Sequence, residues 1–314
     1  MSLSPTRFSA RSRRRAWPLT LLCLSLVVLS PAAPRARAQQ DEEVVRVNSD
    51  LVVLNVTVTD KRGAYVHGLK QADFKVFEDG REQAIAGFGE EETPFAAALL
   101  LDVSGSMEGR ISLARSAAIR FLDGLREDDN VAVYSFHSNV KQVQDFGYTR
   151  DLAPMVFRLN AEGLTVLNDA VVQAAHDLAA RPEKRRAIVV LSDGADTHSA
   201  ASTEKALNAA LTANATIYTV DLSDRNARRP ESMGGSAALN AFAARSGGRY
   251  LATPGGQELR EAFAAVVEEL SNQYTVSYRP TNRARDGRWR TIEIKLARAD
   301  AQPRTRRGYR APKG

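Results

Sequence analysis

The chain has 314 residues, of which 44% are hydrophobic and 25% charged, as in ordinary globular proteins; a disordered or collagen-like chain is excluded. Its formal net charge is +6, but residues 1–38 hold seven arginines and no acidic residue. If that segment is removed, 36 basic and 37 acidic residues remain, so the charge does not indicate nucleic-acid binding. The single cysteine, Cys23, lies in the same segment, which excludes disulfides and thiol chemistry from the remainder.

Residues 1–38 have the pattern of a secretory signal peptide. An arginine-rich start precedes the apolar run Leu19–Leu29, and Ala36-Arg37-Ala38 predicts cleavage after Ala38. The apolar run is well short of the roughly 20 residues that a spanning helix needs. We therefore expect export to the periplasm, cell surface or medium, with membrane association only through an uncleaved signal. Arg13, Arg14 and Arg15 leave the choice between the general and the twin-arginine route open.

Residues 39–92 are predicted to form a small β region. Leu54, Val56 and Val58 alternate with polar residues, as in a half-buried strand. Asp79-Gly80 separates two further strand-like runs, and this dipeptide favours a tight hairpin because both positions tolerate positive φ.

Residues 93–273 alternate between strand and helix patterns. Continuous apolar runs predict buried strands, and amphipathic segments lie between them; the runs are 96–101, 131–136, 187–191 and 216–220. Residues 140–146 are interpreted as a short edge strand. Buried strands separated by amphipathic helices predict an α/β fold with a doubly wound, mostly parallel sheet and helices on both faces.

Residues 274–314 return to β patterns and carry a basic tail. The strands expected at 274–278 and 291–296 are too few to be stable alone. We expect them to pack with residues 39–92 as one small β unit beside the central domain. Arg304, Arg306 and Arg307 are interpreted as a solvated strand face, with attraction to acidic polymers or lipids as the alternative.

Three polar clusters follow or face the ends of the predicted central strands. Asp102-Val103-Ser104-Gly105-Ser106 follows the first strand, Gly163-Leu164-Thr165 precedes a helix, and Ser192-Asp193-Gly194 follows the strand at 187–191. Ligands of doubly wound sheets bind at the carboxyl ends of the strands. We therefore expect Asp102, Ser104, Ser106 and Thr165 to supply oxygen ligands to Mg²⁺, with Mn²⁺ or Ca²⁺ as substitutes. Asp193 is expected to orient a coordinated water.

These residues resemble the metal-ion-dependent adhesion site of von Willebrand factor type A domains. The family pattern Asp-x-Ser-x-Ser, then Thr, then Asp is met by Asp102, Ser104, Ser106, Thr165 and Asp193. The flanking segments resemble those of secreted acidobacterial-type relatives. Leu164 stands where many relatives have glycine. The resemblance implies a doubly wound sheet and a non-enzymatic module that binds a protein partner through a divalent ion, which an Asp or Glu of that partner completes.

Other interpretations stay open for some of these residues. Asp102, Ser104, Ser106, Thr165 and Asn168 are also helix-capping residue types. Ser192, Asp193 and His198 could suggest a hydrolase, although no Gly-x-Ser-x-Gly elbow is present. The four histidines form no zinc-binding pair.

At the end of a further strand, Asp221 and Asp224 are interpreted as solvated loop residues, with a role at the site rim as the alternative. The alternative function is a structural envelope component whose ion only stabilises the fold. The partner's identity and the oligomeric state are not readable from the sequence.

Overall fold

The apolar runs of the central region form one six-stranded sheet in the computed structural model, which describes residues 51–89, 93–193, 195–223, 230–253 and 255–314. The strand order is β10-β9-β8-β5-β6-β7, and all neighbours are parallel except β7, the antiparallel edge strand. The strands are β5 (Phe95–Asp102), β6 (Asn130–Phe136), β7 (Val140–Gly147), β8 (Arg185–Ser192), β9 (Ala215–Asp221) and β10 (Tyr250–Ala252). The short strand β10 has no counterpart among the predicted strands.

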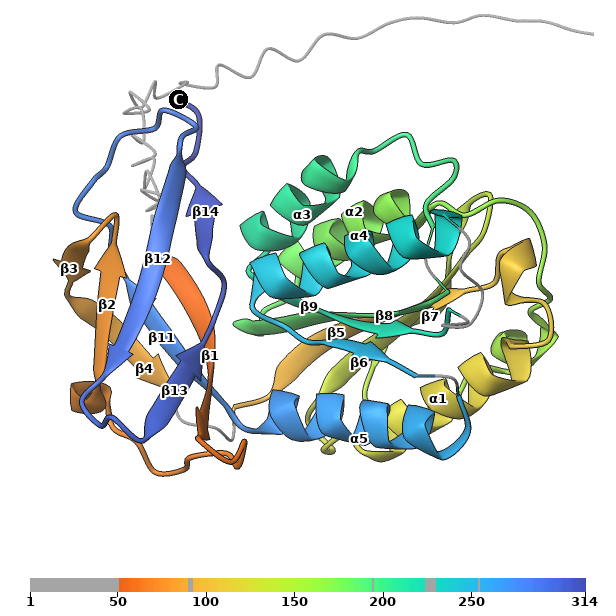
Figure 1. Cartoon of the computed structure of the whole chain (residues 1–314), viewed down its shortest axis with the longest axis horizontal. Coiled ribbons are helices and arrows are strands. Elements are labelled where there is room, and N and C mark those ends of the chain that lie inside the picture. The colour runs from red at the N-terminus through yellow and green to blue at the C-terminus, as the bar shows by residue number, and fades with distance from the viewer. Residues whose placement is uncertain (1–50, 90–92, 194, 224–229, 254) are drawn as a thin grey trace, which may run out of the picture. The chain divides into compact units, whose positions relative to one another are not determined.

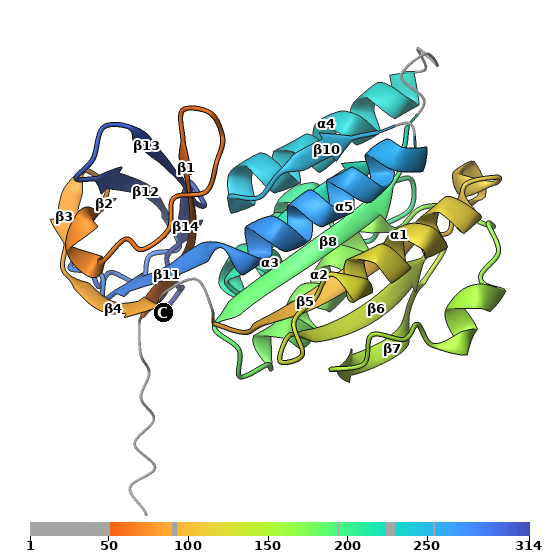
Figure 2. The same cartoon turned by 90° about the horizontal axis from the view of Figure 1, so that it is seen from below.

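Helices cover both faces of this sheet (Figure 1). One face packs against α1 (Ile111–Asp123) and α5 (Gly256–Ser271), which lie side by side (Figure 2). The other packs against α2 (Leu167–Ala179), α3 (Thr203–Thr212) and α4 (Pro230–Ser246).

Alternate residues of each central strand supply the two cores. In β5, Leu99 and Leu101 lie in the core beneath α1 and α5, whereas Ala98 and Leu100 lie in the core beneath α2 and α3. Successive side chains of a strand point to opposite faces, so a strand buried on both faces is apolar at every position. The predicted doubly wound, mostly parallel class is confirmed.

The two flanks of the central region form a pair of antiparallel four-stranded sheets. One has the order β13-β1-β11-β4 and the other β14-β12-β2-β3. The strands are β1 (Val52–Asp60), β2 (Phe74–Glu78), β3 (Arg81–Gln83), β4 (Ile85–Gly89), β11 (Gln273–Tyr278), β12 (Trp289–Leu296), β13 (Ala301–Arg304) and β14 (Gly308–Arg310). Their inner faces share one apolar core, so the small β unit is built from both ends of the chain. The boundaries at residues 38, 92 and 273 stay predictions.

The hairpin between β2 and β3 has the predicted turn. Asp79 and Gly80 both adopt positive φ, at 47° and 78°, and the strands pair as antiparallel neighbours. The predicted signal peptide lies outside the described residues. Among the residues that the structure does describe, no helix is long and apolar enough to cross a membrane.

The expectation that Arg304, Arg306 and Arg307 form a solvated strand face is wrong for Arg304 and Arg306. Arg306 is buried, donates to the carbonyl oxygens of Leu211 (2.8 Å) and Val53 (2.9 Å), and has its pKa lowered to about 10 by burial. Arg304 pairs with the buried carboxylate of Glu269 on α5 at 2.5 Å. Only Arg307 is exposed. The guanidinium groups of Arg304 and Arg306 therefore join the β unit to the central domain.

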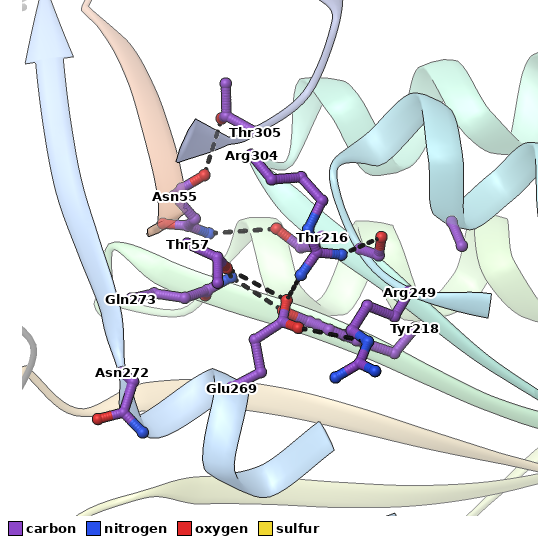
Figure 3. Close-up of polar contacts among 12 residues, drawn as sticks. Asn55, Thr57, Thr216, Tyr218, Arg249, Glu269, Asn272, Gln273, Arg304 and Thr305 are labelled. Atoms are coloured by element: carbon purple, nitrogen blue, oxygen red, sulfur yellow. Dashed lines mark hydrogen bonds and ion pairs between the residues drawn. The ribbon is translucent and has the colours of Figure 1, made fainter. Parts of the chain in front are cut away.

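Glu269 is the centre of this polar junction (Figure 3). Its carboxylate accepts hydrogen bonds from the hydroxyls of Thr57 (3.2 Å) and Tyr218 (2.9 Å) as well as pairing with Arg304. The amide of Gln273 donates to both hydroxyls, which completes the network. A buried carboxylate is tolerated only when it is paired and hydrogen-bonded in this way.

Replacing Arg306 tests this junction. We expect Arg306→Ala to lower the free energy of unfolding by about 2–4 kcal/mol, because the carbonyl groups of Leu211 and Val53 lose their charged donor. The adjacent Arg307→Ala, which removes the same charge from an exposed position, is the matched control and should change it by less than about 0.5 kcal/mol. Urea denaturation of both variants measures the difference; equal midpoints would contradict the assignment.

Candidate metal centre

The predicted polar clusters meet at the point where the sheet reverses its winding. From β5 the chain passes over one face through α1 to β6, and it later returns through α2 on the other face to β8, on the opposite side of β5. The carboxyl ends of β5 and β8 are paired in register, with Leu101 opposite Leu191. Asp102 and Ser192 therefore end adjacent strands at the position where such sheets bind ligands.

Asp102 is a buried carboxylate held by two donors. Its Oδ1 accepts from the backbone N–H of Ser104 at 2.8 Å, and its Oδ2 accepts from the hydroxyl of Ser192 at 2.5 Å. Burial raises the pKa of Asp102 to about 6, against the lowering effect of the bonds from Ser104 and Ser192, and the nearby charge of Asp193 raises it slightly further. A carboxylate in this position gains from a cation that replaces its lost hydration.

The loop after Asp102 directs two hydroxyls to the same place. Ser104 is extended and precedes the short helix Gly105–Met107, and the hydroxyl oxygens of Ser104 and Ser106 lie 3.0 Å apart. The Ser106 hydroxyl donates to Oδ1 of Asp193 at 2.8 Å. Asp102, Ser104, Ser106 and Asp193 are thus one hydrogen-bonded cluster, contributed by the ends of β5 and β8.

Thr165 lies on a loop that is bonded to the first. The Gly105 N–H donates to the Gly163 carbonyl at 3.2 Å, and a Cβ on Gly105 would lie 3.3 Å from that oxygen, so glycine permits the close approach. Thr165 is buried; its N–H donates to the Thr197 hydroxyl, and its carbonyl accepts from the N–H groups of Thr197 and His198. The fifth predicted residue is therefore held on the loop adjoining the other four.

Helix capping does not account for these side chains. Helix α1 begins at Ile111 behind Arg110, and the helix at Gly105–Met107 begins behind Ser104; neither has a side-chain cap. Helix α2 begins behind Val166, also without a cap of its own, and Asp196 accepts from the Asn168 N–H. Ser104 occupies the N-cap position of the helix Gly105–Met107, but no side-chain capping bond is made there or at the starts of α1 and α2.

The hydrolase alternative finds no support in the placement of Ser192 and His198. Ser192 is fully buried with its hydroxyl on Asp102, and His198 is exposed and contributes its backbone N–H to Thr165.

Asp221 is also not the solvated loop residue expected. It is buried and accepts from the N–H of Ser223 and the hydroxyls of Ser236 and Tyr250. It therefore holds the end of β9 against α4 and β10. Asp224 lies outside the described residues.

Two contacts at the site have no counterpart in the sequence interpretation. Arg110 pairs with Asp193, with its Nη1 3.1 Å from Oδ2. The segment around Thr197 supports Thr165, as described above. Both contacts join residues more than 30 positions apart, and neither residue type at its position forms a recognisable local pattern. Arg110 lies four residues after Ser106 and Thr197 four residues after Asp193, so each stands close in sequence to a predicted site residue.

The donor chemistry fits Mg²⁺. All five predicted residues offer oxygen, the ligand atom that hard divalent cations prefer. Neighbouring ligands around an octahedral Mg²⁺ with bonds of 2.0–2.1 Å are about 2.9 Å apart. The spacing of the Ser104 and Ser106 hydroxyls, 3.0 Å, matches this value. Within the described ranges, no group of three or more His, Cys, Asp or Glu residues is placed to hold a metal ion.

Part of the central region matches a known domain family in sequence. The sequence profile of the von Willebrand factor type A domain matches residues 97–195. An uncharacterized protein of Synechocystis sp. is 34% identical over 110 residues, which is 33% of this chain but only 26% of that protein. This chain therefore spans about a quarter of that relative.

Solved structures of the same family resemble the chain at low sequence identity. A von Willebrand factor type A protein from Catenulispora acidiphila is 14% identical, with a TM-score of 0.48 over 85% of this chain and 75% of that one. The corresponding domain of the type V pili tip protein Mfa5 from Porphyromonas gingivalis is 13% identical, with a TM-score of 0.47 over 56% of this chain and 95% of that one. The match to the von Willebrand factor type A domain thus covers residues 97–195, which include the Asp-x-Ser-x-Ser loop and Asp193.

Proposed function

We propose that the protein is an exported, metal-dependent protein-binding module. The observation that carries the proposal is the cluster of Asp102, Ser104, Ser106 and Asp193 at the switch point of the sheet, with Thr165 on the adjoining loop. Export rests on the signal-peptide pattern of residues 1–38.

In this proposal each residue has a distinct role. Asp102 would anchor the cation, and the hydroxyls of Ser104, Ser106 and Thr165 would supply further oxygen ligands. Asp193, whose two oxygens already accept from Ser106 and Arg110, orients a coordinated water. Bound Mg²⁺ would supply a Lewis-acidic position that an Asp or Glu of a partner protein fills.

A binding role fits these residues better than catalysis. Ser192, the serine that suggested a hydrolase, is fully buried and donates to Asp102, so it is not presented to a substrate. Leu164, by contrast, is 48% exposed next to Thr165 and offers an apolar contact for a protein surface.

Metal-dependent partner binding can be tested by a crosslinking pull-down from the envelope of the source organism. We expect the wild-type protein to retain a partner in Mg²⁺ and to lose it in EDTA, and Asp102→Asn to lose it in both. Asp123→Asn, which removes an exposed carboxylate at the end of α1, is the matched control and should retain it. Identical partners under all conditions would contradict the proposal; an ion that only stabilises the fold would leave partner binding insensitive to EDTA.

The raised pKa of Asp102 predicts a pH-dependent response to the metal. The folded carboxyl keeps its proton up to about pH 6, whereas the unfolded one loses it near 3.8. In the metal-free protein, the protonated Asp102 therefore contributes fully to the free energy of unfolding below about pH 4. This contribution is lost as the pH rises through 6. Since Mg²⁺ binds the ionised form, we expect it to raise the melting temperature more at pH 7.5 than at pH 5.

The isosteric variant Asp102→Asn is the control for this experiment. Without metal at pH 7.5 it should melt at a higher temperature than the wild type, because a buried charge is removed. It should also not respond to Mg²⁺. Scanning calorimetry measures the melting temperatures with and without Mg²⁺. If Mg²⁺ raised the melting temperature of Asp102→Asn as much as that of the wild type, the ion would bind elsewhere.

A further inference from the structure

Arg110 reaches from the start of α1 to the candidate metal centre. It is the residue before Ile111, and its guanidinium Nη1 lies 3.1 Å from Oδ2 of Asp193. The Asp193 side chain is 11% exposed and that of Arg110 31% exposed. Arg110 is the more exposed of the two and so lies on the solvent side of Asp193.

The stability of α1 does not explain an arginine here. The N-terminus of a helix carries partial positive charge, so a cationic side chain at that end is unfavourable by about 0.3–1 kcal/mol. The first turn of α1 has no acidic residue that would offset it. The ion pair with Asp193 is the interaction that the position of Arg110 provides.

The pairing changes the formal charge of the site. Asp102 and Asp193 contribute two negative charges, and Arg110 cancels one of them. A divalent cation then leaves the centre with one positive charge, whereas without Arg110 the same centre would be neutral. Because Asp102 is fully buried, its charge is screened less than a charge in open solvent.

We propose that Arg110 is a specificity-determining residue that makes the metal-loaded site selective for a carboxylate. By pairing with Asp193 it keeps the loaded centre positive, and its planar fork of N–H donors binds the oxygen of the partner carboxylate that the ion does not. This inference rests on the proposed function, since it requires the cation.

The proposal predicts that Arg110→Met strengthens the binding of the metal ion and weakens the binding of a carboxylate. Arg110→Met leaves Asp193 uncompensated, so Mn²⁺, the spectroscopic substitute for Mg²⁺, should bind several-fold more tightly. Acetate should then bind the Mn²⁺-loaded variant about tenfold more weakly than the wild type, because a charge-assisted contact and the net positive charge are both lost. A merely structural role would weaken both together.

Two other variants complete the experiment. Arg120→Met removes the same charge from an exposed position about 15 Å further along α1 and should match the wild type in both measurements. Arg110→Lys retains the charge but not the fork, so it should keep the wild-type Mn²⁺ affinity and bind acetate with intermediate affinity.

Electron paramagnetic resonance measures Mn²⁺ binding through the signal of free Mn²⁺. Acetate binding is measured by the decrease in the relaxation rate of water protons when acetate is added to the Mn²⁺-loaded protein. Acetamide is the neutral control. Tighter Mn²⁺ with weaker acetate in Arg110→Met supports the proposal. Wild-type behaviour of Arg110→Met in both measurements overturns it and leaves the metal site intact. A wild-type protein that binds no Mn²⁺ overturns the proposed function as well.

Discussion

The carboxylate of Asp102 is the constraint around which the site is organised. A buried charge must be hydrogen-bonded or paired, and here the Ser104 N–H and the Ser192 hydroxyl each donate to one oxygen. The first bond sets the course of the loop that carries Ser106, and the second joins the ends of β5 and β8. Asp193, the residue after Ser192, is thereby placed next to Ser106. One carboxylate thus connects three of the predicted site residues.

The β unit depends on a second buried carboxylate. Glu269, at the end of α5, is paired with Arg304 and hydrogen-bonded to Thr57 and Tyr218, which belong to β13, β1 and β9. Arg306 adds two bonds to backbone carbonyls on both sides of the junction. The terminal strands therefore meet the central domain through satisfied polar groups as well as apolar packing. Arg304 and Arg306 of the basic tail thus make internal contacts, which the sequence did not indicate.

Strand and helix positions were predictable where burial leaves a periodic pattern. The runs at 96–101 and 187–191 are apolar at every position because β5 and β8 are covered on both faces. The Asp79-Gly80 turn was predictable because positive φ at both positions limits the residue types that can stand there. The short β10 leaves no such pattern, since three half-buried residues are too few to show a period.

The sequence by itself determines the types and order of the site residues Asp102, Ser104, Ser106, Thr165 and Asp193. It also determines the pattern in which polar residues follow apolar strands. Strand order is not determined in this way, because it depends on which parallel strands pair. The structure alone puts β8 beside β5, and so brings Ser192 to Asp102. It alone pairs Arg110 with Asp193 and buries Arg306, because side chains distant in sequence find their partners only when the layers pack.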